Sequence, residues 1–174
     1  MTRPLTLITG GTRGIGAATA VRLAADGHDL VLGYARDESA AEQTCTRAQE
    51  HGVDCLAVRA DLLATDGVQA LFSAAAGHGR LTGVVNNAGA TLHIGPLAET
   101  PDDVIRRTVD LNLTSALLVA RYAVRAMSNS YEGRDGVLVN VSSSAATLGS
   151  PGEYVQYAAA KAGVDAMTLG LAQE

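Results

Sequence analysis

The sequence predicts an α/β fold in which helices cover both faces of a parallel β-sheet, a doubly wound arrangement in three αβα layers. Short runs rich in Val, Leu and Ile alternate with longer helical stretches, the pattern of repeated strand–helix–strand units. Of the 174 residues, 47% are apolar and only 3% aromatic, which suits small helix side chains packed against a buried sheet. We therefore expect one domain over residues 1–174.

The expected elements follow one another without an internal repeat or a linker. Strands are expected near residues 5–9, 30–34, 55–59, 83–86 and 136–141. Helices are expected near 14–26, 39–51, 64–76 and 102–128, and a last one begins near 154. Gly27 can cap the first helix, and Thr100 and Pro101 form a helix start. The last pattern reaches Glu174 without a cap or a breaker, so we expect the natural domain to continue beyond this residue.

Charge and composition exclude several classes of partner. Eighteen acidic and thirteen basic residues give a net charge of −5 without a basic block, so no nucleic-acid partner is expected. No apolar run approaches the roughly 20 residues that cross a bilayer, and no export signal opens the chain. Cys45 and Cys55 match neither a metal-ligand spacing nor a secreted disulfide framework, which favours reduced cysteines in a cytoplasmic protein.

A glycine-rich turn, residues 9–16, joins the first strand directly to the first helix. Unpaired N–H groups and the dipole at a helix N-terminus favour a pyrophosphate there. Gly10 would make the tight turn, Gly14 the close approach to the phosphates and Gly16 the helix–sheet contact. Because the spacing differs from the common dinucleotide fingerprint, a glycine turn without a ligand is the alternative. The cofactor-binding candidates in the turn are Gly10, Thr12, Arg13, Gly14, Ile15 and Gly16.

The end of the second strand bears on the choice of cofactor. In dinucleotide-binding folds an acidic residue there accepts hydrogen bonds from the adenine ribose. Here the strand ends in Tyr34 and Arg36, both candidates for cofactor contact, and Arg36 with Arg13 would bind a 2′-phosphate. NADP(H) is therefore predicted. Because Asp37 and Glu38 follow directly, a shift of one residue would favour NAD(H), the second choice.

Tyr157 and Lys161 stand four residues apart in a strongly helical stretch, so both side chains project from one face. A free tyrosine, with a pKa of about 10, is a poor base near neutral pH. A cation held close favours the phenolate and yields a group that exchanges a proton near working pH. Taken alone, the same spacing is also expected for two residues without a catalytic role, a core tyrosine and a surface lysine on one amphipathic helix.

The order of the motifs along the chain narrows the interpretation. The glycine turn is followed by Asn-Asn-Ala-Gly at 86–89, Asn112, three serines at 142–144, and then Tyr157 and Lys161. In this order the whole chain strongly resembles the short-chain dehydrogenase/reductase family, closest to 3-oxoacyl-[acyl-carrier-protein] reductases and glucose dehydrogenases. The resemblance implies a Rossmann-type sheet without the last strands of the family fold.

The resemblance also implies roles for individual residues. Tyr157 would be the general acid in carbonyl reduction, or the base in alcohol oxidation, and it would also contact the cofactor. Lys161 would bind the nicotinamide ribose hydroxyls and lower the Tyr157 pKa, and Asn112 would hold a water that links Lys161 to solvent. Five further residues would contact the cofactor, the first two at the adenine ring: Asp61, Leu62, Asn87, Ala88 and Gly89.

Two serines compete for the substrate oxygen. The commonest family interval, counted back from Tyr157, gives Ser144, whereas counting forward from the strand residue Asn140 gives Ser143. The strand fixes the position of the serine backbone, whereas an insertion in the loop 148–154 would change the interval counted back from Tyr157. The forward count is therefore used, and Ser143 is preferred.

Two functions of different class remain open. The first is hydride transfer between NADP(H) and a small carbonyl or secondary alcohol, and the second is a nucleotide-binding or interaction module without turnover. The intact Tyr, Lys, Asn and Ser set favours the enzyme. In the family, helices equivalent to 102–128 and to the last helix pair between subunits, and their apolar faces predict a homodimer or homotetramer.

Overall fold

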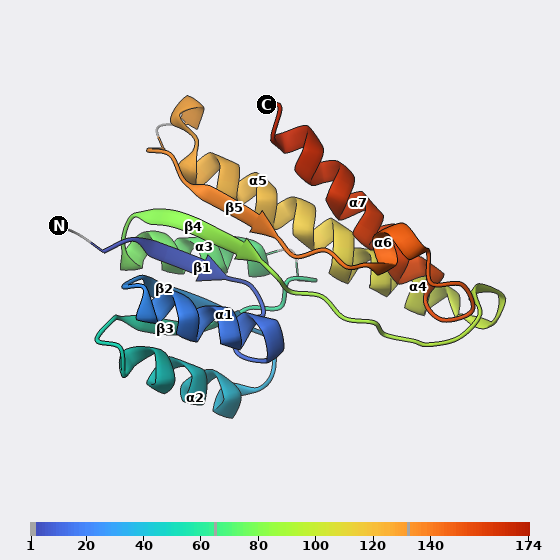
Figure 1. Ribbon diagram of the computed structural model, residues 1–174, viewed down its shortest axis with the longest axis horizontal. Coiled ribbons are helices and arrows are strands. Elements are labelled where there is room, and N and C mark those ends of the chain that lie inside the picture. Colours follow the sequence, from blue (N-terminus) through green and yellow to red (C-terminus); the bar gives the residue numbers. More distant parts are fainter. Residues whose placement is uncertain (1–2, 65, 132) are drawn as a thin grey trace.

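The computed structural model describes residues 3–64, 66–131 and 133–174, which form a parallel sheet between two layers of helices (Figure 1). The strands are β1 (Leu5–Ile8), β2 (Asp29–Tyr34), β3 (Cys55–Arg59), β4 (Leu81–Asn86) and β5 (Val137–Asn140). The larger helices are α1 (Gly14–Ala25), α2 (Glu38–Gln49), α3 (Gly67–His78), α4 (Asp102–Val109), α5 (Ser115–Met127) and α7 (Val155–Leu171). Shorter pieces are α6 (Ala145–Leu148), η1 (Leu97–Glu99), η2 (Asp110–Thr114) and η3 (Asn129–Tyr131).

The five strands pair in the order β3-β2-β1-β4-β5, all parallel. The chain leaves β1 toward β2 on one side and later returns to β4 on the other. In sheets of this kind, ligands bind at the carboxyl ends of the strands where the order reverses. The topology therefore places a binding crevice beside the ends of β1 and β4.

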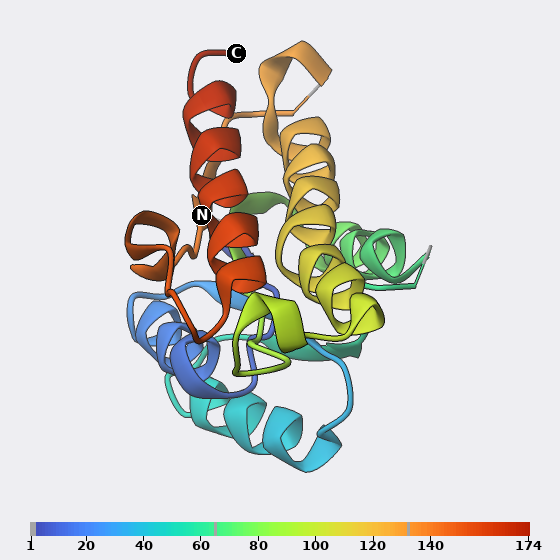
Figure 2. The same cartoon turned by 90° about the vertical axis from the view of Figure 1, so that its right-hand side faces the viewer.

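Two apolar clusters lie on opposite faces of the sheet, because side chains alternate along a strand. Leu5 and Leu7 of β1 pack with Leu71 of α3 and Val119 of α5. On the other face, Ile8 packs with residues of α1 and α2. All four residues of β1 are buried, as expected for a central strand covered on both sides. The three-layer prediction is confirmed, and Figure 2 shows α5 and α7 side by side at one end of the molecule.

The predicted strands agree with the structure to within two residues at each end, but three helical details differ. The third predicted helix, 64–76, lies instead at Gly67–His78, and α6 was not predicted. The stretch 102–128 is helical throughout but contains a π-helical turn, η2, which puts Asn112 in a widened segment. Among the described residues, none of the helices has the length and apolarity needed to cross a membrane.

Candidate active site

A cleft of about 740 Å³ opens at the carboxyl ends of the strands. Its walls come from the glycine turn, the segments that follow β2 to β5, the α4–η2 region and α7. The residues that line it and were predicted from sequence are Gly10, Thr12, Arg13, Gly14, Ile15, Tyr34, Arg36, Asp61, Asn87, Ala88, Gly89, Tyr157 and Lys161. Segments far apart in the chain thus meet around one space.

Asn87 fixes the shape of the glycine turn. Its side-chain amide donates to the carbonyl oxygens of Thr9, at 2.9 Å, and Gly10, at 3.1 Å. The Thr9 hydroxyl in turn accepts the backbone N–H groups of Asn87 and Ala88. Gly10 has φ of +60°, a conformation that favours glycine. The loop after β4 is therefore tied to the turn after β1.

Gly16 does not line the cleft but packs beneath the turn. A Cβ atom at this position would collide with the carbonyl oxygen of Gly10 and would lie 2.8 Å from the Asn87 amide nitrogen. From the side of α2, the Thr44 hydroxyl lies within hydrogen-bond distance of two carbonyl oxygens, that of Ala40 at 2.8 Å and that of Thr12 at 3.1 Å. The turn is thus supported by backbone packing and by a buried hydrogen bond.

Three exposed arginines line the end of the cleft that lies over β1, β2 and β3: Arg13, Arg36 and Arg59. Arg59 was missed by the sequence analysis. It is the last residue of β3, and its register partner on β2 is Tyr34, so the strand pairing brings it beside the predicted cofactor residues.

These arginines have no acidic partner. Among the residues that the structure describes, the ion pairs are Arg3–Asp29 and Arg22–Asp26. The two acids that line the same cleft accept hydrogen bonds from backbone N–H groups instead. Asp37 accepts one from Ala40, and Asp61 accepts one from Leu63. The guanidinium groups are therefore free to bind an anion.

Leu62, predicted to contact the cofactor, packs instead against the core on the α3 face. Its neighbour Leu63 lines the cleft. The side chains of consecutive residues diverge in the turn after β3, where the Leu63 N–H donates to the Asp61 carboxylate at 3.0 Å. Spacing alone does not show which of the two leucines faces the cleft.

Tyr157 and Lys161 come from α7 and face the same cleft. The Lys161 Nζ lies 5.8 Å from the centre of the Tyr157 ring. Lys161 is only 4% exposed, and its Nζ donates to the carbonyl oxygen of Val141, just after β5, at 2.8 Å. Burial lowers the pKa of Lys161, an effect that Asp165 opposes. The pair is thus positioned by both the helix and the sheet.

The serines after β5 have different environments. Ser142, which sequence analysis did not choose, lines the cleft, but its hydroxyl donates to the Lys161 carbonyl oxygen at 3.3 Å. The Ser143 oxygen accepts the Ala145 N–H at 3.2 Å, which leaves its proton available to another acceptor. Neither Ser143 nor the exposed Ser144 is among the residues that line the cleft.

Asn112 is fully buried, and its side chain holds the backbone together. Its amide nitrogen donates to the carbonyl oxygens of Ala90 and Thr108, both at 2.9 Å, and its amide oxygen accepts the Ala90 N–H at 3.0 Å. A Cβ on Gly89 would lie 2.6 Å from this oxygen and 3.3 Å from the Lys161 Nζ. Asn112 therefore lies next to Lys161 without lining the cleft, and it clamps the loop after β4.

A three-layer αβα domain with a glycine turn over its central strand is typical of dinucleotide-binding proteins. The family model described as short chain dehydrogenase matches residues 4–174. The chain belongs to this family, whose members related to it by sequence are oxidoreductases.

Two curated relatives illustrate the similarity. An uncharacterized oxidoreductase of Escherichia coli, YgfF, is 38% identical over 171 residues, which cover 98% of this chain and 69% of that protein. A 3-oxoacyl-[acyl-carrier-protein] reductase of Synechocystis is 35% identical over 175 residues, which cover 100% of this chain and 69% of that protein. The chain thus spans about two thirds of the length of these relatives.

Two solved structures agree with the fold. The NADH-dependent reductase A1-R′, complexed with NAD, has a TM-score of 0.90 at 29% identity, with 99% of this chain and 73% of that chain covered. A short chain dehydrogenase from Burkholderia cenocepacia in complex with NADP has a TM-score of 0.90 at 33% identity. The match covers 98% of this chain and 67% of that chain. These neighbours support a nicotinamide cofactor without distinguishing the two forms.

Proposed function

We propose that this chain is the catalytic domain of an NADP(H)-dependent oxidoreductase that interconverts a small carbonyl compound and a secondary alcohol. The observation that carries the proposal is one cleft lined by the glycine turn, by three unpaired arginines at its β1–β3 end and by Tyr157 with Lys161. Family membership supports the reaction class. A nicotinamide cofactor, when bound, supplies or accepts the hydride.

The residues present fit such a cofactor. The turn has no side chain at Gly10 or Gly14, and Gly14 has φ of +50° with open space where a Cβ would project. Backbone N–H groups at the start of α1 would hold the pyrophosphate. Asn87, Ala88 and Gly89 would line the path toward α7, and Asp61 would bind the adenine.

Side chains of the protein itself would transfer the proton. Tyr157 would donate its hydroxyl proton to the substrate oxygen during reduction and take it back during oxidation. Ser143, whose proton is uncommitted in the structure, would donate a second hydrogen bond to that oxygen and make the carbonyl more electrophilic. Lys161 would bind the nicotinamide ribose hydroxyls, and the clamp formed by Asn112 would keep the loop after β4 in place beside Lys161.

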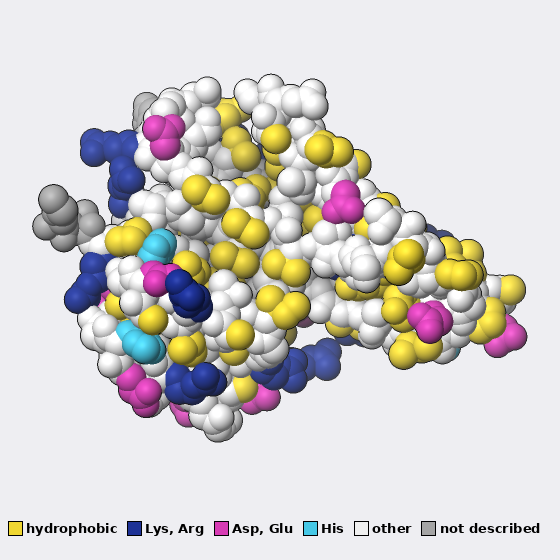
Figure 3. Space-filling model, viewed as in Figure 1, with side chains coloured by type: hydrophobic (Ala, Val, Ile, Leu, Met, Phe, Trp, Pro, Cys, Tyr) yellow, Lys and Arg dark blue, Asp and Glu magenta, His cyan; other side chains and the backbone are white. Residues whose placement is uncertain are grey.

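Leu92 and Leu111 form an apolar part of the cleft lining, and further apolar side chains are exposed on the loop after β4 and on α6. Ile94 and Leu148 are 70% and 73% exposed, in the loop after β4 and in α6. A hydrogen bond of 2.6 Å from the Gly95 N–H to the Glu153 carbonyl joins the two loops. Figure 3 shows apolar side chains gathered on the end of the molecule formed by α4 and α6. This surface favours a substrate with an apolar portion next to its carbonyl group.

The test is steady-state oxidation of NADPH with a panel of ketones and 3-oxoacyl thioesters, together with an NADPH binding titration. The proposal predicts both binding and turnover of at least one apolar carbonyl compound. Binding without turnover of any compound, in the complete gene product, would instead establish the alternative of a nucleotide-binding module.

Arg36→Ala should weaken NADPH binding at least about tenfold more than NADH binding. One charge-assisted hydrogen bond contributes roughly 1.5–3 kcal/mol, and each 1.4 kcal/mol is about a factor of ten in Kd. Arg59→Ala should act in the same direction, because Arg59 lines the same end of the cleft. Calorimetric titration with both nucleotides measures the difference.

Arg22→Ala is the matched control for the arginine variants. Arg22 is an exposed arginine of α1 that is paired with Asp26 at 2.9 Å, and it does not line the cleft. It should leave both affinities unchanged. If Arg36→Ala lost the same affinity for NADPH as for NADH, this arginine would not bind the 2′-phosphate.

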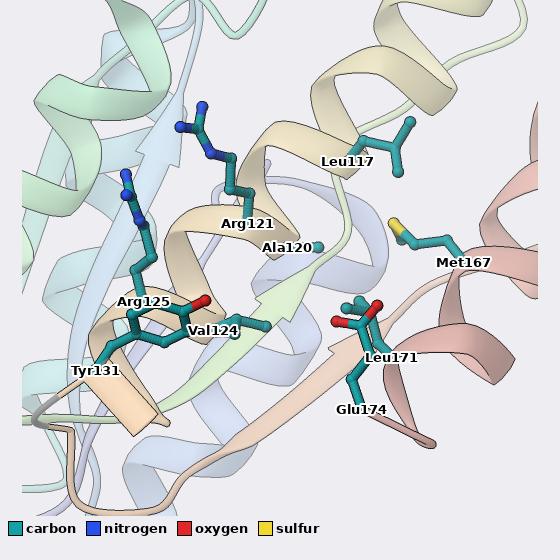
Figure 4. Close-up of a pocket in the computed structure, with 9 residues that line it drawn as sticks. All are labelled: Leu117, Ala120, Arg121, Val124, Arg125, Tyr131, Met167, Leu171 and Glu174. Carbon is teal, nitrogen blue, oxygen red and sulfur yellow. The ribbon is translucent and has the colours of Figure 1, made fainter. Parts of the chain in front are cut away.

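We also propose that the protein forms a homodimer or homotetramer through the exposed sides of α5 and α7. A groove of about 360 Å³ lies between these helices, with Leu117, Met167 and Leu171 among its apolar residues (Figure 4). Leu117 and Leu169 are 47% and 67% exposed. Sedimentation velocity that shows only monomers of the complete protein would contradict this assembly.

A further inference from the structure

The structure brings together two cysteines that the sequence spacing did not pair. Cys45 lies in α2 and Cys55 is the first residue of β3. Their Sγ atoms are 2.8 Å apart, and both are free thiols. This separation is longer than the roughly 2.0 Å of a disulfide bond, but it is short enough for bond formation without a large movement of either backbone.

The two thiols differ in access. Cys45 is 8% exposed and belongs to the apolar cluster on the α1 and α2 face, with Leu30 and Ala48. Cys55 is only partly buried, and β3 is an edge strand of the sheet. A small oxidant therefore has a route to the pair from the edge of the sheet.

The thiols also differ in acidity. A hydrogen bond from the Cys55 thiol lowers the pKa of Cys45, and the same bond, together with burial, raises the pKa of Cys55. The thiolate is the reactive form of cysteine. Cys45 is accordingly the thiol that attacks the oxidant, and Cys55 is the neighbour that resolves the product.

We propose that Cys45 and Cys55 form a modification site, a dithiol that a hydroperoxide converts to an intramolecular disulfide and that a thiol reductant restores. The Cys45 thiolate attacks one peroxide oxygen, breaks the O–O bond and becomes a sulfenic acid, while the other oxygen leaves as hydroxide or an alcohol. The Cys55 sulfur then attacks the Cys45 sulfur, and water leaves with the Cys55 proton. In total, two thiols lose two electrons and two protons, and the peroxide is reduced.

Cys55 begins β3 and so lies away from the cofactor end of the sheet, but both elements that carry the pair extend to that end. The hydroxyl of Thr44, next to Cys45, lies 3.1 Å from the Thr12 carbonyl oxygen of the glycine turn, and β3 ends at Arg59. The cross-link joins α2 to β3, the two elements that carry these residues. It should therefore hold α2 against the sheet and stabilise this half of the domain, whether or not the protein turns over a carbonyl substrate.

The test is brief exposure of the complete protein to hydrogen peroxide, followed by mass spectrometry, thiol titration in denaturant and thermal unfolding. We expect both thiols to disappear, the mass to fall by two hydrogens and the melting temperature to rise by roughly 5 °C, since a short cross-linked loop restricts the unfolded chain. Dithiothreitol should reverse all three changes.

Cys55→Ala is the matched variant, because it keeps Cys45 and removes its partner. It should show neither the loss of two hydrogens nor the rise in melting temperature. The proposal would be overturned if both thiols of the unchanged protein survived peroxide, or if one gained oxygen atoms while the other stayed free.

Discussion

Replacing Tyr157 by Phe is expected to lower kcat for carbonyl reduction by about 10²- to 10⁴-fold, the usual contribution of a general acid. The substitution removes the hydroxyl that would donate the proton and keeps the aromatic ring, whose edge-to-face contact with Tyr154 at 5.6 Å is preserved. The affinity for NADPH should therefore fall much less than kcat. Steady-state kinetics with a carbonyl compound from the panel, together with an NADPH titration, gives both values.

Tyr154→Phe is the matched control for that variant. Tyr154 precedes α7 and contacts the Tyr157 ring, but it does not line the cleft. Loss of its hydroxyl should leave kcat nearly unchanged. Similar activity losses in the two variants would assign the effect to packing around α7, and full activity of Tyr157→Phe would exclude this tyrosine as the proton donor.

The second large effect is expected from Gly16→Ala. The added methyl group would meet the Gly10 carbonyl oxygen and the Asn87 amide, which cannot both move without disturbing the hydrogen bonds that fix the turn. Overpacking of this kind costs roughly 1–3 kcal/mol, and a loss of that size in cofactor binding raises the NADPH Kd by about 5- to 150-fold. Calorimetry and thermal unfolding separate the loss of affinity from the loss of stability.

Gly77→Ala provides the comparison for Gly16→Ala. Gly77 also lies in a helix, α3, but a Cβ there meets no atom within 4 Å. This variant should bind NADPH normally and be slightly more stable, because alanine is favoured over glycine by up to about 1 kcal/mol in a helix. If Gly16→Ala behaved in the same way, the close packing beneath the turn would have no part in cofactor binding.

The sequence was sufficient for the positions of the strands along the chain and for most of the cleft. Each strand is marked by a local apolar run, and the glycine turn, Tyr157 and Lys161 are local patterns whose positions follow once the sheet is parallel. The carboxyl ends of parallel strands lie at one edge, so residues that follow β1, β2 and β4 meet there.

The features that sequence analysis missed depend on contacts between distant segments. Arg59 reaches the cleft because β3 pairs with β2 in a register that no local pattern encodes. The π-helical turn is stabilised by the hydrogen bonds that Asn112 forms with Ala90, on another segment. The approach of Cys45 to Cys55 likewise depends on the packing of α2 over the edge strand.

The most direct test of the account is a crystal structure of the protein with NADP+ bound. We expect the pyrophosphate at the start of α1, the 2′-phosphate within hydrogen-bond distance of Arg36, and the nicotinamide beside the Tyr157 hydroxyl and Lys161. A nucleotide bound elsewhere, or one whose nicotinamide lies away from Tyr157, would contradict it.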